Sequence, residues 1–330
     1  MRGLGCTTKD TILAAAIAAL VVSPARGARA TPRASSEARD PVPGPGATLL
    51  PVHELFDPTG GRNERAIIAS RPRAYRLGPT LAGPALLVLG LPGRATAAES
   101  FGQFLSRGLI HARVGRELVV ATIHDPRTGG PVRQGAASPR RANSWRLDRW
   151  TIDVLGLFVS RLLRATGCDA LLVVGYSSGG AAAPLLAARL AGRGIRVVGA
   201  VSIAEGTAAG ALELRQARVR VLFLAAPPQR PTDRGVQPDL SSRERAERSY
   251  RRLLDGGVDA ELRHIDSARR HLRWHWGLIS PCRFVAPGRS ATPAGSWPDY
   301  WRPNPETISS IGAFIGQRSR RPASGDPCAP

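Results

Sequence analysis

The sequence predicts an α/β fold with a mostly parallel central sheet and helices on both faces of that sheet. Three observations indicate this class. Short, almost wholly apolar runs recur along residues 49–317, as is typical of strands buried on both faces. Helical patterns fill the intervals between the runs, which is the alternation that a parallel sheet requires. The chain has 330 residues, 43% of them hydrophobic, and is therefore long enough to bury a large core.

Apolar runs mark the strands of this sheet. Near the start, Ala66–Ser70 and Ala74–Leu77 flank an Arg71-Pro72-Arg73 turn and are predicted to form an antiparallel entry hairpin. Between the runs that end at 203 and begin at 219 there is no room for a lid domain, so no sizeable lid is expected. The remaining strands are predicted at Ala85–Leu89, Leu118–Ile123, Ala170–Val174, Val197–Ile203, Val219–Leu224 and Ala260–Ile265, the last lying nearer an edge.

Helices are predicted from apolar spacing and from capping residues. Apolar side chains between Ile152 and Leu162 recur at helical spacing. Ser241 and Glu244 have capping-box spacing and begin a helix that Gly256-Gly257 ends. Asn304-Pro305-Glu306 combines a cap, a proline at the first helical position and an acid in the first turn, and so begins a closing helix.

The first thirty residues have the layout of a secretory signal peptide. Arg2 and Lys9 precede the apolar run Thr11–Val22, and a small-residue end, Ala28-Arg29-Ala30, follows. As a helix the run rises only about 18 Å, short of a ~30 Å hydrocarbon core, although an uncleaved anchor remains the alternative. We therefore expect a secreted or periplasmic protein with a signal peptide at 1–30, a flexible leader at 31–48, one domain at 49–317 and a tail at 318–330.

The net charge of +21 bears on partners. A charge of this size draws a protein towards anionic surfaces such as envelope lipids or acidic polysaccharide. No helix-turn-helix, RNA-recognition or Cys/His finger pattern is present, so no specific nucleic-acid partner is expected. The sequence leaves the oligomeric state open.

The expected export of the protein decides how its cysteines are interpreted, because disulfides form in oxidising compartments. In an oxidising compartment Cys282 and Cys328 could pair, although sequence does not prove the pairing. Cys168 precedes an apolar strand and is interpreted as a small buried residue. The cysteine spacing indicates no metal site, and no metal or other cofactor is expected.

One motif carries chemistry. Gly175-Tyr176-Ser177-Ser178-Gly179-Gly180 follows the strand at 170–174 and precedes an alanine-rich helix, which is a G-x-S-x-G pattern at a strand-to-helix junction. Such a turn holds a serine hydroxyl above the carboxyl edge of a sheet, with a helix N-terminus behind it that favours a developing oxyanion. Ser177 is therefore the predicted nucleophile. The alternatives are a tightly packed helix entry or a phosphate-binding one.

These residues resemble the α/β-hydrolase superfamily, and most of all exported esterases grouped with polyhydroxyalkanoate depolymerases, feruloyl esterases and dienelactone-hydrolase-like enzymes. The resemblance runs from about Ala85 to Ile315. It rests on the buried strand with the loop Thr96–Glu99, on Asp153 in the preceding helix, on the Ser177 junction and on the histidine region. It implies an α/β-hydrolase fold and a triad in the chain order serine, acid, histidine.

The resemblance places the histidine after the last strand. His271 is then the general base, with His275 as the nearest competitor. His264 lies inside the strand pattern and is interpreted as structural. Three further histidines, His53, His111 and His124, lie too early in the chain to fill this role.

The acid of the triad should follow the strand that ends at Leu224. Relatives have a short H-G-x-x-D turn there, whereas this chain has a longer loop without the His-Gly pair. Asp233 is the predicted acid. Asp239 and Glu205 remain alternatives, since Glu205 matches an acid position used elsewhere in the superfamily.

Two backbone N–H groups should form the oxyanion hole, those of Ser178 and Leu91. Relatives have His-Gly where this chain has Gly90-Leu91, which leaves the backbone donor but changes its surroundings.

The expected activity is hydrolysis of small-molecule or polymeric carboxylic esters through an acyl-enzyme on Ser177. A serine peptidase of the same fold and a non-catalytic envelope-binding protein are the alternatives. Comparing hydrolysis of ester and peptide substrates distinguishes an esterase from a peptidase. Fluorophosphonate labelling distinguishes an active serine hydrolase from a binding protein.

Overall fold

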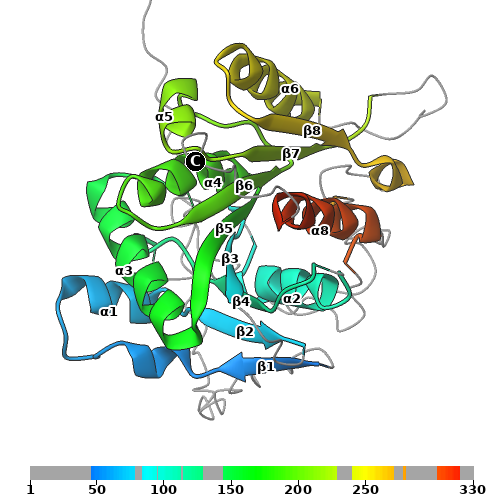
Figure 1. Ribbon diagram of the computed structural model, residues 1–330. Helices are drawn as coiled ribbons and strands as arrows, with labels where there is room; N and C mark the ends of the chain where they lie inside the picture. Colours follow the sequence, from blue (N-terminus) through cyan, green and yellow to red (C-terminus); the bar gives the residue numbers. More distant parts are fainter. Residues whose placement is uncertain are drawn as a thin grey trace, which may run out of the picture. The chain divides into compact units, whose positions relative to one another are not determined.

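A computed structural model describes residues 46–78, 84–94, 96–112, 114–128, 144–228, 240–270, 278–279 and 303–319. Within these residues, eight strands form one sheet in the order β1-β2-β4-β3-β5-β6-β7-β8 (Figure 1). Strand β2 is antiparallel to both of its neighbours, and all pairs from β4 to β8 are parallel. The mostly parallel sheet predicted from the sequence is confirmed.

The elements alternate along the chain as the sequence pattern predicts. The strands are β1 Ala47–Leu50, β2 Arg73–Leu77, β3 Ala85–Leu91, β4 Leu118–Thr122, β5 Cys168–Tyr176, β6 Val197–Ile203, β7 Val221–Ala225 and β8 Ala260–His264. The helices are α1 Arg62–Ala69, α2 Ala98–Leu109, α3 Arg149–Thr166, α4 Ser178–Ala191, α5 Ala211–Gln216, α6 Leu240–Asp255 and α8 Pro305–Ser319, with short 3-10 turns at Val52–Leu55 and Asp266–Arg270.

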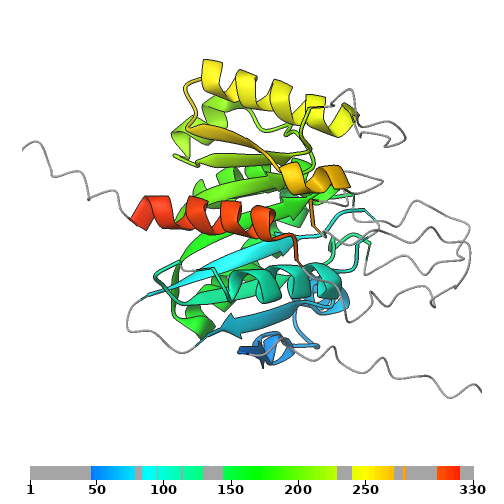
Figure 2. The same ribbon diagram turned by 90° about the vertical axis from the view of Figure 1, so that its right-hand side faces the viewer.

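Helices cover both faces of the sheet. Along β3, Leu87 and Leu89 pack with α3, α4, α5 and α6 in one apolar cluster. The alternate residues Leu86 and Val88 pack with α2 and α8 in a second cluster on the opposite face. Figure 2 looks onto this second face, with α8 and α2 in front of the strands. Because side chains alternate along a strand, one wholly apolar run fills both layers of the core.

The predicted entry hairpin is wrong in one arm. Residues Ala66–Ser70 were expected as a strand, but α1 covers Arg62–Ala69 and buries Ile67. The partner of β2 is instead β1, whose Ala47 lies opposite Leu77. A short apolar run does not by itself distinguish a strand from a helix that buries one face. Strand β1 begins inside the range 31–48 that the composition assigns to the leader.

Of the two predicted helix starts, the Asn304 cap of α8 is confirmed, whereas α6 begins at Leu240 and so contains Ser241 rather than starting after it. Helix α3 has a cap that the sequence analysis did not name. The Asp148 side chain accepts a hydrogen bond from the Thr151 N–H, 2.9 Å long, at the start of α3. At the start of α8, the Asn304 side chain accepts from the N–H groups of Glu306 and Thr307. These caps satisfy backbone donors that a helix leaves unpaired at its first turn. Cys168 is free and buried, as predicted.

Several predictions lie outside the described residues: the signal peptide, most of the leader, Cys282 and Cys328, and the tail beyond 319. Among the helices that the structure describes, none combines the length and the apolar character needed to cross a membrane.

Candidate active site

Ser177 occupies the junction between β5 and α4 at the carboxyl edge of the sheet. Its backbone has φ 53° and ψ −120°, a positive φ that is uncommon for a residue other than glycine. Its N–H donates to the Ile203 carbonyl at 2.9 Å and its carbonyl accepts from the Ala181 N–H at 3.0 Å. Such a backbone costs on the order of 1–3 kcal/mol and persists only where the surroundings hold it.

Two glycines make this turn sterically possible. A Cβ atom on Gly175 would lie 2.0 Å from the Gly179 carbonyl oxygen, and one on Gly179 would lie 2.1 Å from the Leu91 carbonyl oxygen. Both distances are far shorter than any contact that carbon makes with oxygen. The motif therefore uses glycine at these positions because strand, helix and the neighbouring loop pass one another in direct backbone contact.

The two predicted oxyanion residues both flank the junction. Ser178 is the first residue of α4 and is half-buried. Leu91 is the last residue of β3, lies opposite Gly175 in the parallel ladder and has a fully buried side chain. The backbone of β3 thus reaches the serine at its carboxyl end, where ligands of open α/β sheets bind.

Glu205, one of the alternative acids, follows β6 and forms an ion pair. Its two carboxylate oxygens accept hydrogen bonds from the Arg245 guanidinium of α6, the Nη2 contact being 2.9 Å long. One of them also accepts from the Gly206 N–H at 3.0 Å. The Glu205 carboxylate thus joins α6 to the end of β6. If Glu205 were the triad acid, the catalytic histidine would share this carboxylate with the Arg245 guanidinium.

The last strand carries His264 at its end. The His264 Nδ1 atom donates to the Ala226 carbonyl at 3.1 Å, which joins β8 to the residue after β7. Beyond it, Glu306 of α8 accepts from the N–H groups of Asp266 and Ser267 at 3.1 and 2.9 Å. The segment that leads towards His271 is therefore tied to the first turn of α8.

The other predicted triad residues, His271 and Asp233, lie outside the described residues, as do His275 and Asp239. The structure brings Ser177, Ser178 and Leu91 together at one edge of the sheet, and the catalytic roles of these and of the other predicted residues stay predictions.

A buried histidine that the sequence analysis set aside lies after β4. His124 is fully buried, its Nε2 atom lies 3.2 Å from the Ala98 N–H at the start of α2, and Glu99 Oε2 lies 3.4 Å from the same nitrogen. Burial by itself raises the pKa of Glu99, but the adjacent His124 imidazole and the backbone N–H of Glu99 lower it by more, so that the pKa lies below its ordinary value. The contacts fix the beginning of α2 beside the loop that follows β3.

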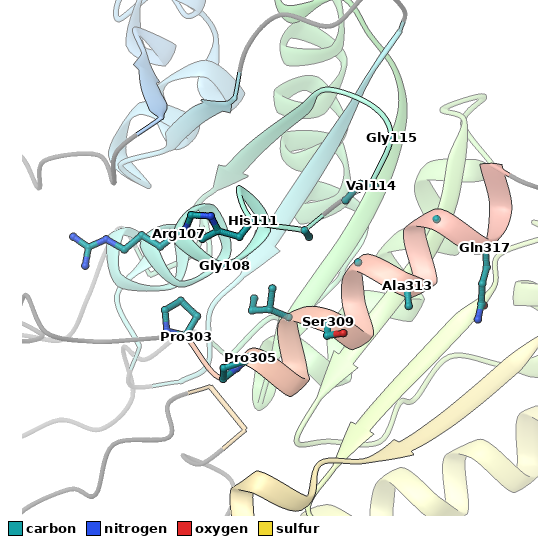
Figure 3. Close-up of a pocket in the computed structure, with 14 residues that line it drawn as sticks. Arg107, Gly108, His111, Val114, Gly115, Pro303, Pro305, Ser309, Ala313 and Gln317 are labelled. Carbon is teal, nitrogen blue, oxygen red and sulfur yellow. The ribbon is translucent and has the colours of Figure 1, made fainter.

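A cavity of about 870 Å³ lies between α2 and α8 (Figure 3). Arg107 lines it from α2, His111 from the turn that follows α2, and Pro305 and Gln317 from α8. None of the predicted site residues that the structure describes lines it. Within the described ranges, no group of three or more His, Cys, Asp or Glu side chains is gathered as a metal site.

The strand order, the antiparallel β2 and the serine junction after β5 together decide the fold. The chain has the α/β-hydrolase fold. No protein-family model matches this sequence, and no curated protein matches it.

Several solved structures of esterases resemble this α/β-hydrolase fold. An arylesterase structure has 10% identity and a TM-score of 0.43 over 74% of this chain and 80% of that one. A putative dienelactone hydrolase from Klebsiella pneumoniae has 18% identity and a TM-score of 0.42, over 59% and 80%. A thermostable esterase from Pseudomonas putida has 12% identity and a TM-score of 0.43, over 74% and 77%. At these identities and TM-scores the likeness carries nothing about the chemistry of this chain.

Proposed function

We propose that the chain is a serine hydrolase that cleaves carboxylic esters through an acyl-enzyme on Ser177. The observation that carries the proposal is the backbone of Ser177, at φ 53° and ψ −120° between a buried strand and a helix N-terminus. A serine with only a packing role gains nothing from this strained conformation, whereas a nucleophile needs it to project its hydroxyl from the sheet edge.

The proposed reaction has two halves. The Ser177 hydroxyl attacks the ester carbonyl while His271, oriented by Asp233, takes the hydroxyl proton. The N–H groups of Ser178 and Leu91 stabilise the oxyanion. The intermediate collapses, His271 returns the proton to the departing alcohol, and an acyl group remains on the serine. Water, deprotonated by His271, then releases the acid and restores the serine.

Export and surface adsorption belong to the same proposal. Residues 1–30 have the layout of a secretory signal, and the net charge of +21 favours contact with anionic envelope surfaces. The substrate is then an extracytoplasmic ester, either a small molecule or a polymer.

The direct test is covalent labelling with a fluorophosphonate, followed by hydrolysis of short-chain, long-chain and aromatic p-nitrophenyl esters against peptide substrates. We expect the wild type to take one label and to prefer esters. Ser177→Ala should take none, whereas Ser309→Ala, at an exposed position of α8, should label normally. An unlabelled wild type would favour the binding-protein alternative, and a preference for peptides would favour the peptidase.

A second comparison assigns the base. His271→Ala should lower kcat by roughly 10³-fold or more, the usual loss on removing a triad member. His275→Ala should retain most of the activity. The reverse result would make His275 the base.

A further inference from the structure

The loop between β3 and α2 lies directly against the proposed nucleophile. A Cβ atom on Gly93 would lie 3.1 Å from the Ser177 Cβ, and one on Gly179 would lie 2.9 Å from the Pro92 carbonyl oxygen. The position of Pro92 and Gly93 therefore determines how backbone amides face the serine.

A buried tryptophan holds this loop. The Trp145 Nε1–H donates a 2.7 Å hydrogen bond to the Pro92 carbonyl, across 53 residues of sequence. Trp145 as a whole residue is 5% exposed, so the bond is shielded from competing water. Pro92, the first residue after β3, has no N–H of its own and can take part only through its carbonyl. The hydrogen bond from Trp145 to the Pro92 carbonyl therefore fixes the position of this turn.

Trp145 is itself held by a buried acid. Asp125, which is fully buried after β4, accepts from the Trp145 backbone N–H at 2.9 Å and from the Arg127 N–H at 3.0 Å. The Ser144 hydroxyl adds a longer contact of 3.4 Å. Trp145 has φ 47°, a conformation that a tryptophan adopts only where such contacts enforce it.

We propose that Trp145 is a positioning residue for the oxyanion hole, acting through Pro92 and held in place by Asp125. The proposal rests on the proposed function. In a trans peptide the C=O and N–H groups point in opposite directions, so fixing the Pro92 carbonyl towards the indole fixes the Gly93 N–H on the opposite side. It also fixes the end of β3 that carries the Leu91 N–H. An oxyanion hole stabilises charge only if its donors are preorganised, and the indole supplies that rigidity.

Trp145→Phe removes the indole N–H and keeps an aromatic ring. We expect kcat for a p-nitrophenyl ester to fall by about 10–100-fold, less than the 10²–10³-fold loss on deleting a whole donor, with KM within about 2-fold. The affinity of a boronic acid, which mimics the tetrahedral intermediate, should fall by the same factor as kcat. Trp150→Phe is the matched control, because within the described residues the Trp150 Nε1 has no hydrogen-bond partner.

Rates are normalised to the sites that a fluorophosphonate titrates, so that a loss of folded protein does not register as a loss of kcat. If Trp145→Phe does not fold, benzothienylalanine at position 145 keeps the bicyclic shape and replaces only the N–H. Unchanged kcat and boronate affinity in the folded variant would overturn the proposal, as would a loss confined to KM. A wild type without label would instead refute the proposed function itself.

Discussion

The two flanks of β5 hold their carboxyl-edge loops in different ways. On the β3–β4 side, Asp125 and Trp145 fix Pro92 through hydrogen bonds whose groups are almost wholly buried. On the β6 side, Glu205 is fixed by Arg245, whose side chain is 43% exposed. Solvent and salt screen the second arrangement but reach the first hardly at all. The flank that faces the proposed oxyanion hole is thus the one whose geometry is independent of the medium.

The largest effect is expected on the buried flank. Asp125→Ala leaves the N–H groups of Trp145 and Arg127 without their acceptor and should lower the free energy of unfolding by about 3 kcal/mol, since each unsatisfied buried donor costs about 1–3 kcal/mol. Urea denaturation measures this loss. Asp125→Asn, which keeps one acceptor oxygen, should lose less. Equal stability of wild type and Asp125→Ala would show that the network holds nothing in place.

The serine between the two flanks should show the next largest effect. Ser177→Gly relieves the backbone strain at φ 53°, whereas Ser177→Ala keeps it. We expect the glycine variant to be more stable than the alanine variant by about 1 kcal/mol, after the larger chain entropy of unfolded glycine is deducted. Thermal unfolding of the two inactive proteins measures the difference. A less stable glycine variant would mean that the conformation is not strained.

The exposed flank should respond weakly. Arg245→Met removes the ion pair with Glu205 and should cost about 0.5 kcal/mol at low salt, because the guanidinium is close to half exposed. The cost should shrink further in 1 M NaCl, where the Debye length is about 3 Å. Asp125→Ala measured in the same two buffers is the control, and its loss should not depend on salt. A salt-independent loss in Arg245→Met would remove the contrast between the flanks.

The smallest expected effect is on stability at low pH and involves Glu99. The pKa of Glu99 is lower in the folded chain than its ordinary value of 4.5, so its contribution to stability is complete above that value and is lost as pH falls through the folded pKa. Glu99→Gln should therefore lose less stability than the wild type below about pH 4.5, and denaturation at several pH values measures this. Parallel curves for the two proteins would contradict the assignment.

Strand positions were predictable where an apolar run admits one interpretation. The run at 197–203 is β6 with the same bounds, and the run at 85–89 continues as β3 to Leu91. The run at 66–70 was misassigned because only Ile67 of α1 is buried and five apolar or small residues show no period. Strand β1 was hidden by the proline- and glycine-rich sequence around it.

The candidate site divides in the same way. The junction at Ser177 is local, since its glycines and serine are adjacent in the chain, and sequence alone predicts it. Trp145 lies 20 residues from Asp125 and 53 residues from Pro92 along the chain. No sequence motif indicates that such distant residues are in contact. The position of His124 early in the chain does not indicate that its side chain is fully buried. Contacts of this kind become visible only once the strands are ordered in space.

The contacts of the first turn of α8 determine what a C-terminal truncation of the protein would remove. The Glu306 carboxylate accepts hydrogen bonds from Asp266 and Ser267, which follow β8 and lead towards residue 271. A variant truncated before Asn304 would keep Ser177 and the eight described strands, but it would lose the hydrogen bonds that join Asp266 and Ser267 to Glu306 and Ser267 to Asn304. Under the proposed function, α8 would contribute to placing the proposed base as well as covering one face of the sheet.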